Sequence, residues 1–227
     1  MFVLVVSRGF PSSLDVMNGN FEADQVRALR ALGHKVVVFS IDRRFNACDR
    51  HIGLNHRFVD GIDVYNFYLL PMPIKTMYKL GYFYIVQMAK LMYWIILRNH
   101  GKPDIIHAHY LYTMPIALNL KSRFKIPCVG TEHWSFVGKS NIPNHVKFYA
   151  ENVYPKLDAL ITVSNSLKTN ISKQFGVESI VIPNMLDISK FNIEAQCDSN
   201  KDGAYFSFIS VGALVGGKCF DLLLKAF

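Results

Sequence analysis

The sequence has few cysteines and few acidic residues, and both shortages narrow what the protein can be. Only four of its 227 residues are cysteines, and none of them forms a Cys-x-x-Cys pair. This spacing argues against a zinc knuckle and a disulfide framework and favours a reducing cytoplasm. Asp and Glu total 17 against 25 Lys and Arg, for a formal net charge of +8. The positive excess favours an anionic partner: lipid, nucleotide phosphate or nucleic acid.

Other features that the sequence lacks exclude further classes of protein. The apolar run 2–6 has only five residues and no preceding positive charge, so we expect a buried first strand and not an export signal. There is no internal repeat. The loop 8–20 does not contain Gly-x-Gly-x-x-Gly, so a dinucleotide fingerprint is not supported. Apolar residue types make up 51% of the chain and charged types 19%, which is typical of a globular protein and not of a disordered one.

Short apolar runs alternate with helix-like segments from end to end. This order predicts an α/β fold, a Rossmann-like parallel sheet with helices on both faces. Because the runs do not alternate with polar residues, both faces of the sheet should be covered. We predict strands at 2–7, 35–41, 62–68, 104–108, 128–131, 159–164 and 179–182. Helices are predicted in 19–34 and at 113–123, 144–154 and 166–175.

The stretch 72–97 is apolar on nearly every side, and its last 18 residues carry Lys90 as their one charge. That length reaches the lower limit for a membrane span. Two observations favour other readings: Gln87 and Lys90 lie near the middle of the stretch, and the fold needs a crossover helix at this position. One such reading is a buried core helix, and the other is a helix whose Tyr, Trp and Lys side chains rest on a membrane surface.

The polar segment 192–204 reads as a linker or a surface loop. We therefore expect one domain over 1–191, a linker over 192–204 and the start of a second domain over 205–227. The last segment reads as a strand, a glycine-containing turn and the opening of a helix. One βα unit has no sheet to pair with, so it should either dock onto the first domain or belong to a longer sequence.

Three short segments place polar groups at predicted strand ends, where ligands bind in open α/β sheets. Gly19 and Asn20 lie where the loop 8–20 enters the first helix, so they either bind an anion or simply cap the helix. His107 and His109 point to one face of a strand, but a metal would need a third ligand and is not favoured. Glu132 and His133 follow the next strand and form either a capping pair or a catalytic one.

Four stretches resemble, in the correct order, the N-terminal half of the GT-B glycosyltransferases of glycosyltransferase family 4. They are GNFEADQVRALRALGHKVVVFS, KPDIIHAHY, IPCVGTEHW, and ALITVSNSLK followed by VIPNMLDISKF. The resemblance covers essentially the whole chain. It implies a retaining transfer of a hexosyl group from a nucleotide diphosphate sugar to a saccharide or lipid-linked acceptor. The N-terminal domain would hold mainly the acceptor and the missing C-terminal part mainly the donor, so the 227 residues alone should be inactive.

The resemblance also extends to single positions. Gly19 is similar to the family's first-loop glycine, and His133 is similar to the histidine that faces the reacting sugar. Ser164 and Asn184 match polar positions of the inter-domain signature. Met185 stands where glycine is usual, which implies a different local backbone.

Within 205–227 the resemblance is to the family's diphosphate loop. Lys218 matches the lysine of that loop, whereas Ala213 stands in place of its arginine and Cys219 in place of a common glycine. These departures predict weaker binding of the donor diphosphate than the family's loop provides.

From the residues and the resemblance together, we expect His133 and Glu132 in catalysis. We expect Gly19, Asn20, His109, Ser164 and Asn184 in substrate binding and Lys218 at the donor diphosphate. No metal and no cofactor beyond the nucleotide sugar substrate are expected, and the location should be cytoplasmic, peripheral at the inner face of a membrane. Two alternatives stay open: a non-catalytic acceptor-binding subunit that needs a donor-binding partner subunit, and a GT-B sugar-nucleotide epimerase. Nucleic-acid binding is not expected because no recognisable module accompanies the charge.

Overall fold

The computed structural model describes residues 1–13, 15–42, 52–69, 77–139, 141–188, 208–212, 214 and 216–227. They form two compact units, Met1–Asp187 and Ile188–Phe227. The predicted linker 192–204 lies outside the described residues, so the predicted domain division stays a prediction.

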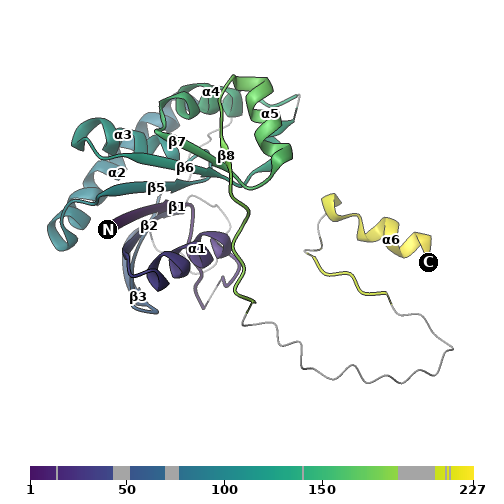
Figure 1. Cartoon of the computed structure of the whole chain (residues 1–227), viewed down its shortest axis with the longest axis horizontal. Coiled ribbons are helices and arrows are strands. Elements are labelled where there is room, and N and C mark those ends of the chain that lie inside the picture. The colour runs from purple at the N-terminus through teal and green to yellow at the C-terminus, as the bar shows by residue number, and fades with distance from the viewer. Residues whose placement is uncertain are drawn as a thin grey trace. The chain divides into compact units, whose positions relative to one another are not determined.

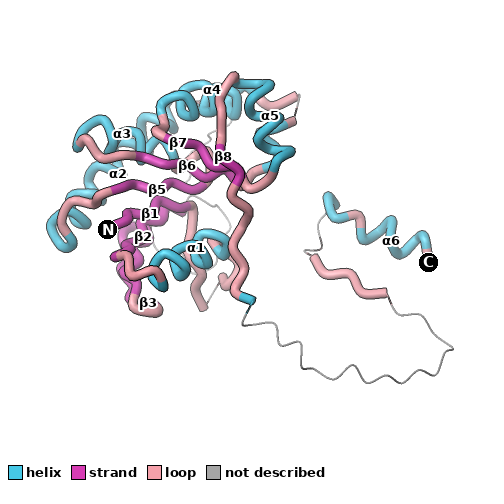
Figure 2. Tube along the Cα trace, viewed as in Figure 1, coloured by secondary structure: helices cyan, strands magenta, loops and turns pink. Residues whose placement is uncertain are grey.

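The first unit is built on one eight-stranded sheet with the order β3-β4-β2-β1-β5-β6-β7-β8 (Figure 2). Its strands are β1 (Phe2–Ser7), β2 (Lys35–Asp42), β3 (Gly53–Val59), β4 (Ile62–Tyr68), β5 (Ile105–His109), β6 (Cys128–Glu132), β7 (Ala159–Thr162) and β8 (Ile180–Val181). Every neighbouring pair is parallel except β3 and β4. The predicted α/β class with a parallel sheet is confirmed.

Helices cover both faces of this sheet (Figure 1). They are α1 (Asn20–Ala31), α2 (Tyr78–His100), α3 (Met114–Phe124), α4 (Asn144–Val153) and α5 (Asn165–Phe175), with 3-10 turns at η1 (Ser135–Gly138) and η2 (Tyr154–Lys156). Successive β1 side chains point to opposite faces: Val3 and Val5 pack with α1, and Leu4 and Val6 belong to the core under α2 to α5. All six β1 residues are buried, which explains the unbroken apolar run.

The sequence analysis missed strand β3, which pairs antiparallel with β4 at the sheet edge. Its residues are half-buried or exposed, so it has no continuous apolar run. Asp60 (φ 51°) and Gly61 (φ 74°) form the tight turn between the two strands. Positive φ at both central residues is the geometry of a type I′ hairpin turn, which Asp-Gly favours.

The helix α5 begins at Asn165, one residue before its predicted start. Ser164 is its N-cap, because the Ser164 hydroxyl accepts a hydrogen bond from the Leu167 N–H at 3.2 Å. This cap also ends β7 at Thr162, before the predicted strand end at 164.

The apolar stretch 72–97 contains α2, while residues 72–76 lie outside the described residues. Ile85, Ala89, Tyr93 and Ile96 are buried in the core, so one side of α2 is a core helix as one reading predicted. Among the described residues, α2 is the one helix whose length and composition would allow it to cross a membrane, and 39% of its apolar window is buried within the fold.

The second unit contains the 3-10 turn η4 (Gly216–Lys218) and the helix α6 (Phe220–Ala226). The predicted strand at the start of 205–227 is not formed in residues 208–212. A strand needs a partner for its backbone groups, and the described residues of this unit supply none.

Candidate active site

The candidate site lies at the edge of the sheet where β1, β5 and β6 end. These three strands are parallel neighbours, so the segments that follow them meet at one place. Arg8 follows β1, Tyr110 follows β5, and His133 and Trp134 follow β6. Sequence analysis placed the site at this edge, and the structure brings five of its predicted residues there: Gly19, Asn20, His109, His133 and Asn184.

Two glycines allow the two ends of the loop after β1 to approach each other closely. Gly19 has φ 80°, in the left-handed region that favours glycine. A Cβ added at Gly19 would lie 2.3 Å from the Gly9 carbonyl oxygen, and one at Gly9 would overlap the Asn18 side chain. The loop therefore folds onto itself just before α1. Asn20 is the first residue of that helix, and its amide contacts the Met17 sulfur at 3.8 Å.

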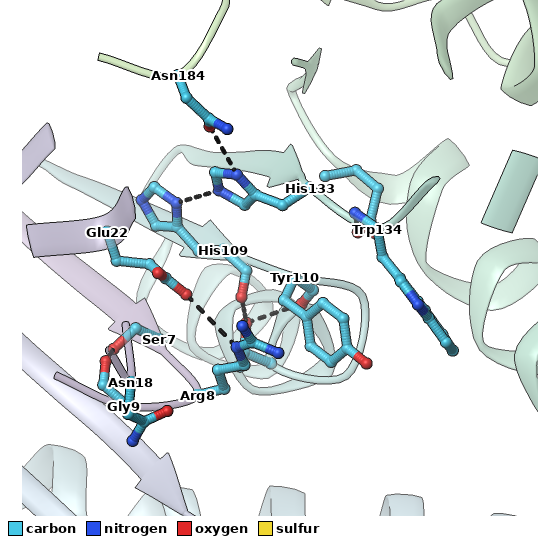
Figure 3. A network of polar contacts seen from close by, with 12 residues as sticks. Ser7, Arg8, Gly9, Asn18, Glu22, His109, Tyr110, His133, Trp134 and Asn184 are labelled. Carbon is cyan, nitrogen blue, oxygen red and sulfur yellow. Dashed lines mark hydrogen bonds and ion pairs between the residues drawn. The ribbon is translucent and has the colours of Figure 1, made fainter. Parts of the chain in front are cut away.

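A chain of hydrogen bonds joins His109, His133 and Asn184 (Figure 3). His109 Nδ1 lies 3.0 Å from His133 Nε2, and His133 Nδ1 lies 2.9 Å from the Asn184 side-chain oxygen. The two ring planes are 18° apart and the centroids 5.3 Å apart, so the imidazoles meet edge to edge. The Asn184 oxygen can only accept, so His133 Nδ1 carries the proton and His109 Nδ1–H donates to His133 Nε2.

Burial keeps the histidines of this cluster neutral. It lowers the pKa of His133 and, more strongly, that of His109, and the charge of neighbouring histidines adds to the effect on His109. His109 is fully buried, and within the described part of the chain its Nε2 has no hydrogen-bond partner. His133 thus presents a neutral ring near pH 7, oriented by one partner on each nitrogen.

His107 points to the same face as His109, as predicted, but it is bound differently. Its Nε2 lies 2.7 Å from the Thr131 hydroxyl, and burial lowers its pKa to about 4. Among the described residues, no group of three His, Cys, Asp or Glu side chains could hold a metal ion. The absence of a metal in the mechanism stays a prediction.

Glu132 points away from His133, because successive strand residues face opposite sides of a sheet. Its carboxylate accepts hydrogen bonds from the Trp134 N–H at 2.9 Å and the Tyr154 hydroxyl at 2.8 Å. Burial raises its pKa to about 7. The partners that orient His133 are therefore His109 and Asn184, not Glu132.

Sequence reasoning missed Arg8 and Tyr110, which line a cleft of about 490 Å³ together with Asp42 and Tyr112. The Arg8 guanidinium lies over the Tyr110 ring at 5.2 Å, and its Nε is 3.9 Å from a Glu22 carboxylate oxygen. Tyr110 has φ 76°, a strained conformation for a residue other than glycine and one that is enriched at functional sites. A sequence signal existed for Arg8, which directly follows the central strand.

A smaller cavity of about 120 Å³ shares Arg8 and Tyr110 with this cleft and is also lined by His133. It is lined by Arg8, Phe21, Glu22, Tyr110, His133 and Trp134. A cation, a neutral imidazole and aromatic rings on one wall can bind a polar ligand through hydrogen bonds and through stacking against its apolar faces.

Besides Glu132, two predicted site residues are not part of this cluster. The Ser164 hydroxyl is used to cap α5. Lys218 is exposed and belongs to the second unit, so its role at a donor diphosphate stays a prediction.

Comparison with known proteins relates this chain to sugar-transferring enzymes. Residues 21–190 match the model of Glycosyltransferase Family 4. A search of curated proteins gave no match.

Several solved structures share the fold. Sucrose-phosphate synthase from Thermosynechococcus elongatus has a TM-score of 0.61 at 13% identity, covering 83% of this chain and 49% of that one. A structure described as trehalose-6-phosphate from E. coli bound with UDP-2-fluoro glucose has a TM-score of 0.57 at 14% identity, covering 84% and 50%. HepE from Anabaena in complex with UDP-glucose has a TM-score of 0.53 at 16% identity, covering 83% and 45%. The chain thus spans about half the length of these structures.

Proposed function

The chain belongs to glycosyltransferase family 4, and on that premise we propose that it takes part in transferring a hexosyl group from a nucleotide diphosphate sugar to a saccharide or lipid-linked acceptor. The observation that carries the proposal is the His109–His133–Asn184 chain beside the Arg8 cleft, at the carboxyl edge of the sheet. In this proposal the cleft receives the acceptor and His133 contacts the reacting sugar.

The proposed reaction moves one sugar and one proton. An acceptor hydroxyl oxygen bonds to the anomeric carbon of the donor sugar, whose bond to the diphosphate breaks. The hydroxyl proton passes to the diphosphate oxygen from which the sugar departs, and the nucleotide leaves as its diphosphate. Charge grows on the leaving group, so fixed positive groups nearby would lower the barrier. We propose retention at the anomeric carbon by resemblance to the family.

His133 acts here as a hydrogen-bonding group. Its Nε2 already accepts from His109, and its Nδ1–H donates to Asn184. Asn184 is exposed, so a sugar hydroxyl can take its place and accept the Nδ1–H. Because burial lowers the pKa of His133, the ring stays neutral and keeps His109 as its donor while the sugar binds.

The donor is proposed by analogy with the solved structures. HepE was crystallised with UDP-glucose and the E. coli structure with UDP-2-fluoro glucose, while a starch synthase from Arabidopsis thaliana was bound to ADP and acarbose. These ligands support a nucleotide diphosphate sugar and leave the base and the hexose open. UDP-glucose and ADP-glucose are therefore the first donors to test.

The test uses the protein isolated from its source cell. Its intact mass is measured first, so that the assay is run on the protein in the length that the cell makes. It is incubated with each donor and a panel of saccharide and lipid-linked acceptors, and products are identified by mass spectrometry. We expect an extended acceptor and released nucleoside diphosphate. His133→Ala should lower turnover at least tenfold with unchanged thermal unfolding, because one well-placed hydrogen bond in a buried site contributes about that much.

His34→Ala is the matched control. His34 directly precedes β2, so it lies at the amino ends of the strands, away from the site, and its substitution should leave turnover unchanged. Two outcomes would favour the alternatives. An epimerised nucleotide sugar without an extended acceptor would indicate a sugar-nucleotide epimerase. Acceptor binding without turnover, together with recovery of a donor-binding subunit from the source cell, would indicate a non-catalytic subunit. Unchanged turnover in His133→Ala would remove His133 from the mechanism.

A further inference from the structure

The outward side of α2 carries large apolar residues that the fold does not cover. Leu80, Phe83, Leu91 and Trp94 are 50%, 60%, 61% and 50% exposed. They recur at helical spacing, opposite the side that Ile85, Ala89 and Ile96 bury in the core. We call these four residues the α2 outer face. Such a row of exposed side chains is unusual on a soluble surface and marks an interaction site.

The charged residues of α2 itself are all positive. The sequence of α2 has no Asp or Glu, while Lys79, Lys90 and Arg98 lie along it. Lys79 and Arg98 are exposed, and the Lys90 ammonium donates to the Gln87 side chain at 3.0 Å. Apolar side chains flanked by cations complement an anionic membrane surface. The apolar side chains enter the headgroup boundary, and the cationic groups meet the lipid phosphates.

The neighbouring helices α3 and α4 add further aromatic and cationic side chains next to α2. Trp94 packs edge-on against Phe124 of α3, with ring centroids 5.9 Å apart, and the Arg123 guanidinium lies 5.7 Å from the Phe124 ring centroid. At the other end of α2, the Lys79 ammonium lies over the Phe148 ring of α4 at 6.0 Å. Amphipathic side chains of this kind sit at membrane–water boundaries.

The buried side of α2 argues against a spanning helix. Tyr93 and Ile96 are fully buried, and Ile85, Ala89 and Met92 are at least 98% buried in the core. Crossing a bilayer would expose this core, whereas lying on the surface leaves it intact. We propose that the α2 outer face docks on an anionic lipid bilayer while the fold stays as it is. This inference goes beyond the proposed transfer reaction and does not depend on it.

The experiment is co-sedimentation of the purified protein with vesicles of phosphatidylcholine alone and of phosphatidylcholine mixed with phosphatidylglycerol. The protein should bind the mixed vesicles, and added salt should release it. Lys79→Glu with Lys90→Glu should weaken binding more than tenfold, because each basic residue near the surface contributes about fivefold. Trp emission should shift to shorter wavelength on binding, and Trp94→Phe should lose that shift.

Phe83→Ser with Trp94→Ser should abolish binding, and Leu32→Ser is its matched control. Leu32 is 74% exposed at the end of α1, which packs on the face of the sheet opposite α2, so its loss should leave binding unchanged. Three results would overturn the proposal: equal binding to neutral vesicles, binding that survives loss of Phe83 and Trp94, or a dimer on gel filtration that these substitutions dissociate. Release from vesicles only by detergent would indicate a spanning helix and would also overturn it. Because sedimentation measures no turnover, its failure leaves the transferase proposal standing.

Discussion

Two buried groups in adjacent strands have pKa values displaced in opposite directions, and their effects on stability should oppose each other. Burial lowers the pKa of His107 from 6.5 to about 4 and raises that of Glu132 from 4.5 to about 7. His107 is 7% exposed and Glu132 is fully buried, so solvent screens neither group. Each displacement corresponds to about 3 kcal/mol between the two protonation states.

Whether acid raises or lowers the free energy of unfolding depends on the protons that each group takes up or releases when the chain unfolds. Between pH 6.5 and about 4 the unfolded chain protonates His107 and the folded chain does not, so acid lowers the free energy of unfolding. Between pH 4.5 and about 7 the folded chain keeps a proton on Glu132 that the unfolded chain releases, so acid raises that free energy. From pH 7 to pH 5 each contribution changes by about 2 kcal/mol, and the two cancel.

Single substitutions should reveal each contribution separately. From pH 7 to pH 5, His107→Gln should gain about 2 kcal/mol of unfolding free energy relative to the unsubstituted chain, and Glu132→Gln should lose about 2 kcal/mol. Urea unfolding monitored by fluorescence measures both, since the two tryptophans, Trp94 and Trp134, lie in the first unit. Comparing each variant with itself at two pH values removes the cost of the substitution. Changes of the same sign, or no change, would refute the reasoning.

Two further predictions concern the first loop and the imidazole chain. Gly19→Ala should lower the free energy of unfolding by about 3 kcal/mol, because its Cβ would meet the Gly9 carbonyl oxygen at a φ of 80°; Gly33→Ala, with φ 81° and open space, should cost only about 1 kcal/mol. Urea unfolding checks both, and equal losses would contradict the steric argument. Asn184→Ala should lower the pKa of His133 further, because the hydrogen bond from its ring to Asn184 favours the charged form. NMR titration of the ring measures this, and an unchanged pKa would show that the bond does not form in solution.

The buried part of the sheet was predictable, and its edge was not. Parallel strands covered on both faces leave unbroken apolar runs, as in β1 and β2. Strand β3 has no such run because it forms an exposed edge. Its one clear signal was the Asp60-Gly61 pair, which favours a hairpin turn wherever extended segments flank it.

The position of the site was predictable from the ends of the strands, but the contacts between its side chains were not. His133 was found because it follows a strand. The opposite direction of Glu132 also follows from the two-residue period of a strand, although sequence reasoning paired the two residues. The contacts of Arg8 could not be foreseen, because Glu22 and Tyr110 reach it from α1 and from the end of β5, and no local pattern encodes that meeting.

The central place of β1 also has a consequence for how the chain folds. Its first partner, β2, is complete by residue 42, but its second partner, β5, begins only at Ile105. The Asp104 carboxylate that accepts a hydrogen bond from the Phe2 N–H, 102 residues away in sequence, arrives with it. During synthesis on the ribosome, one edge of the most apolar strand must therefore wait unpaired for about 60 further residues, some 3–12 s at ordinary translation rates. Such an edge is a template for pairing with another chain, so the nascent protein is open to unwanted association during this interval.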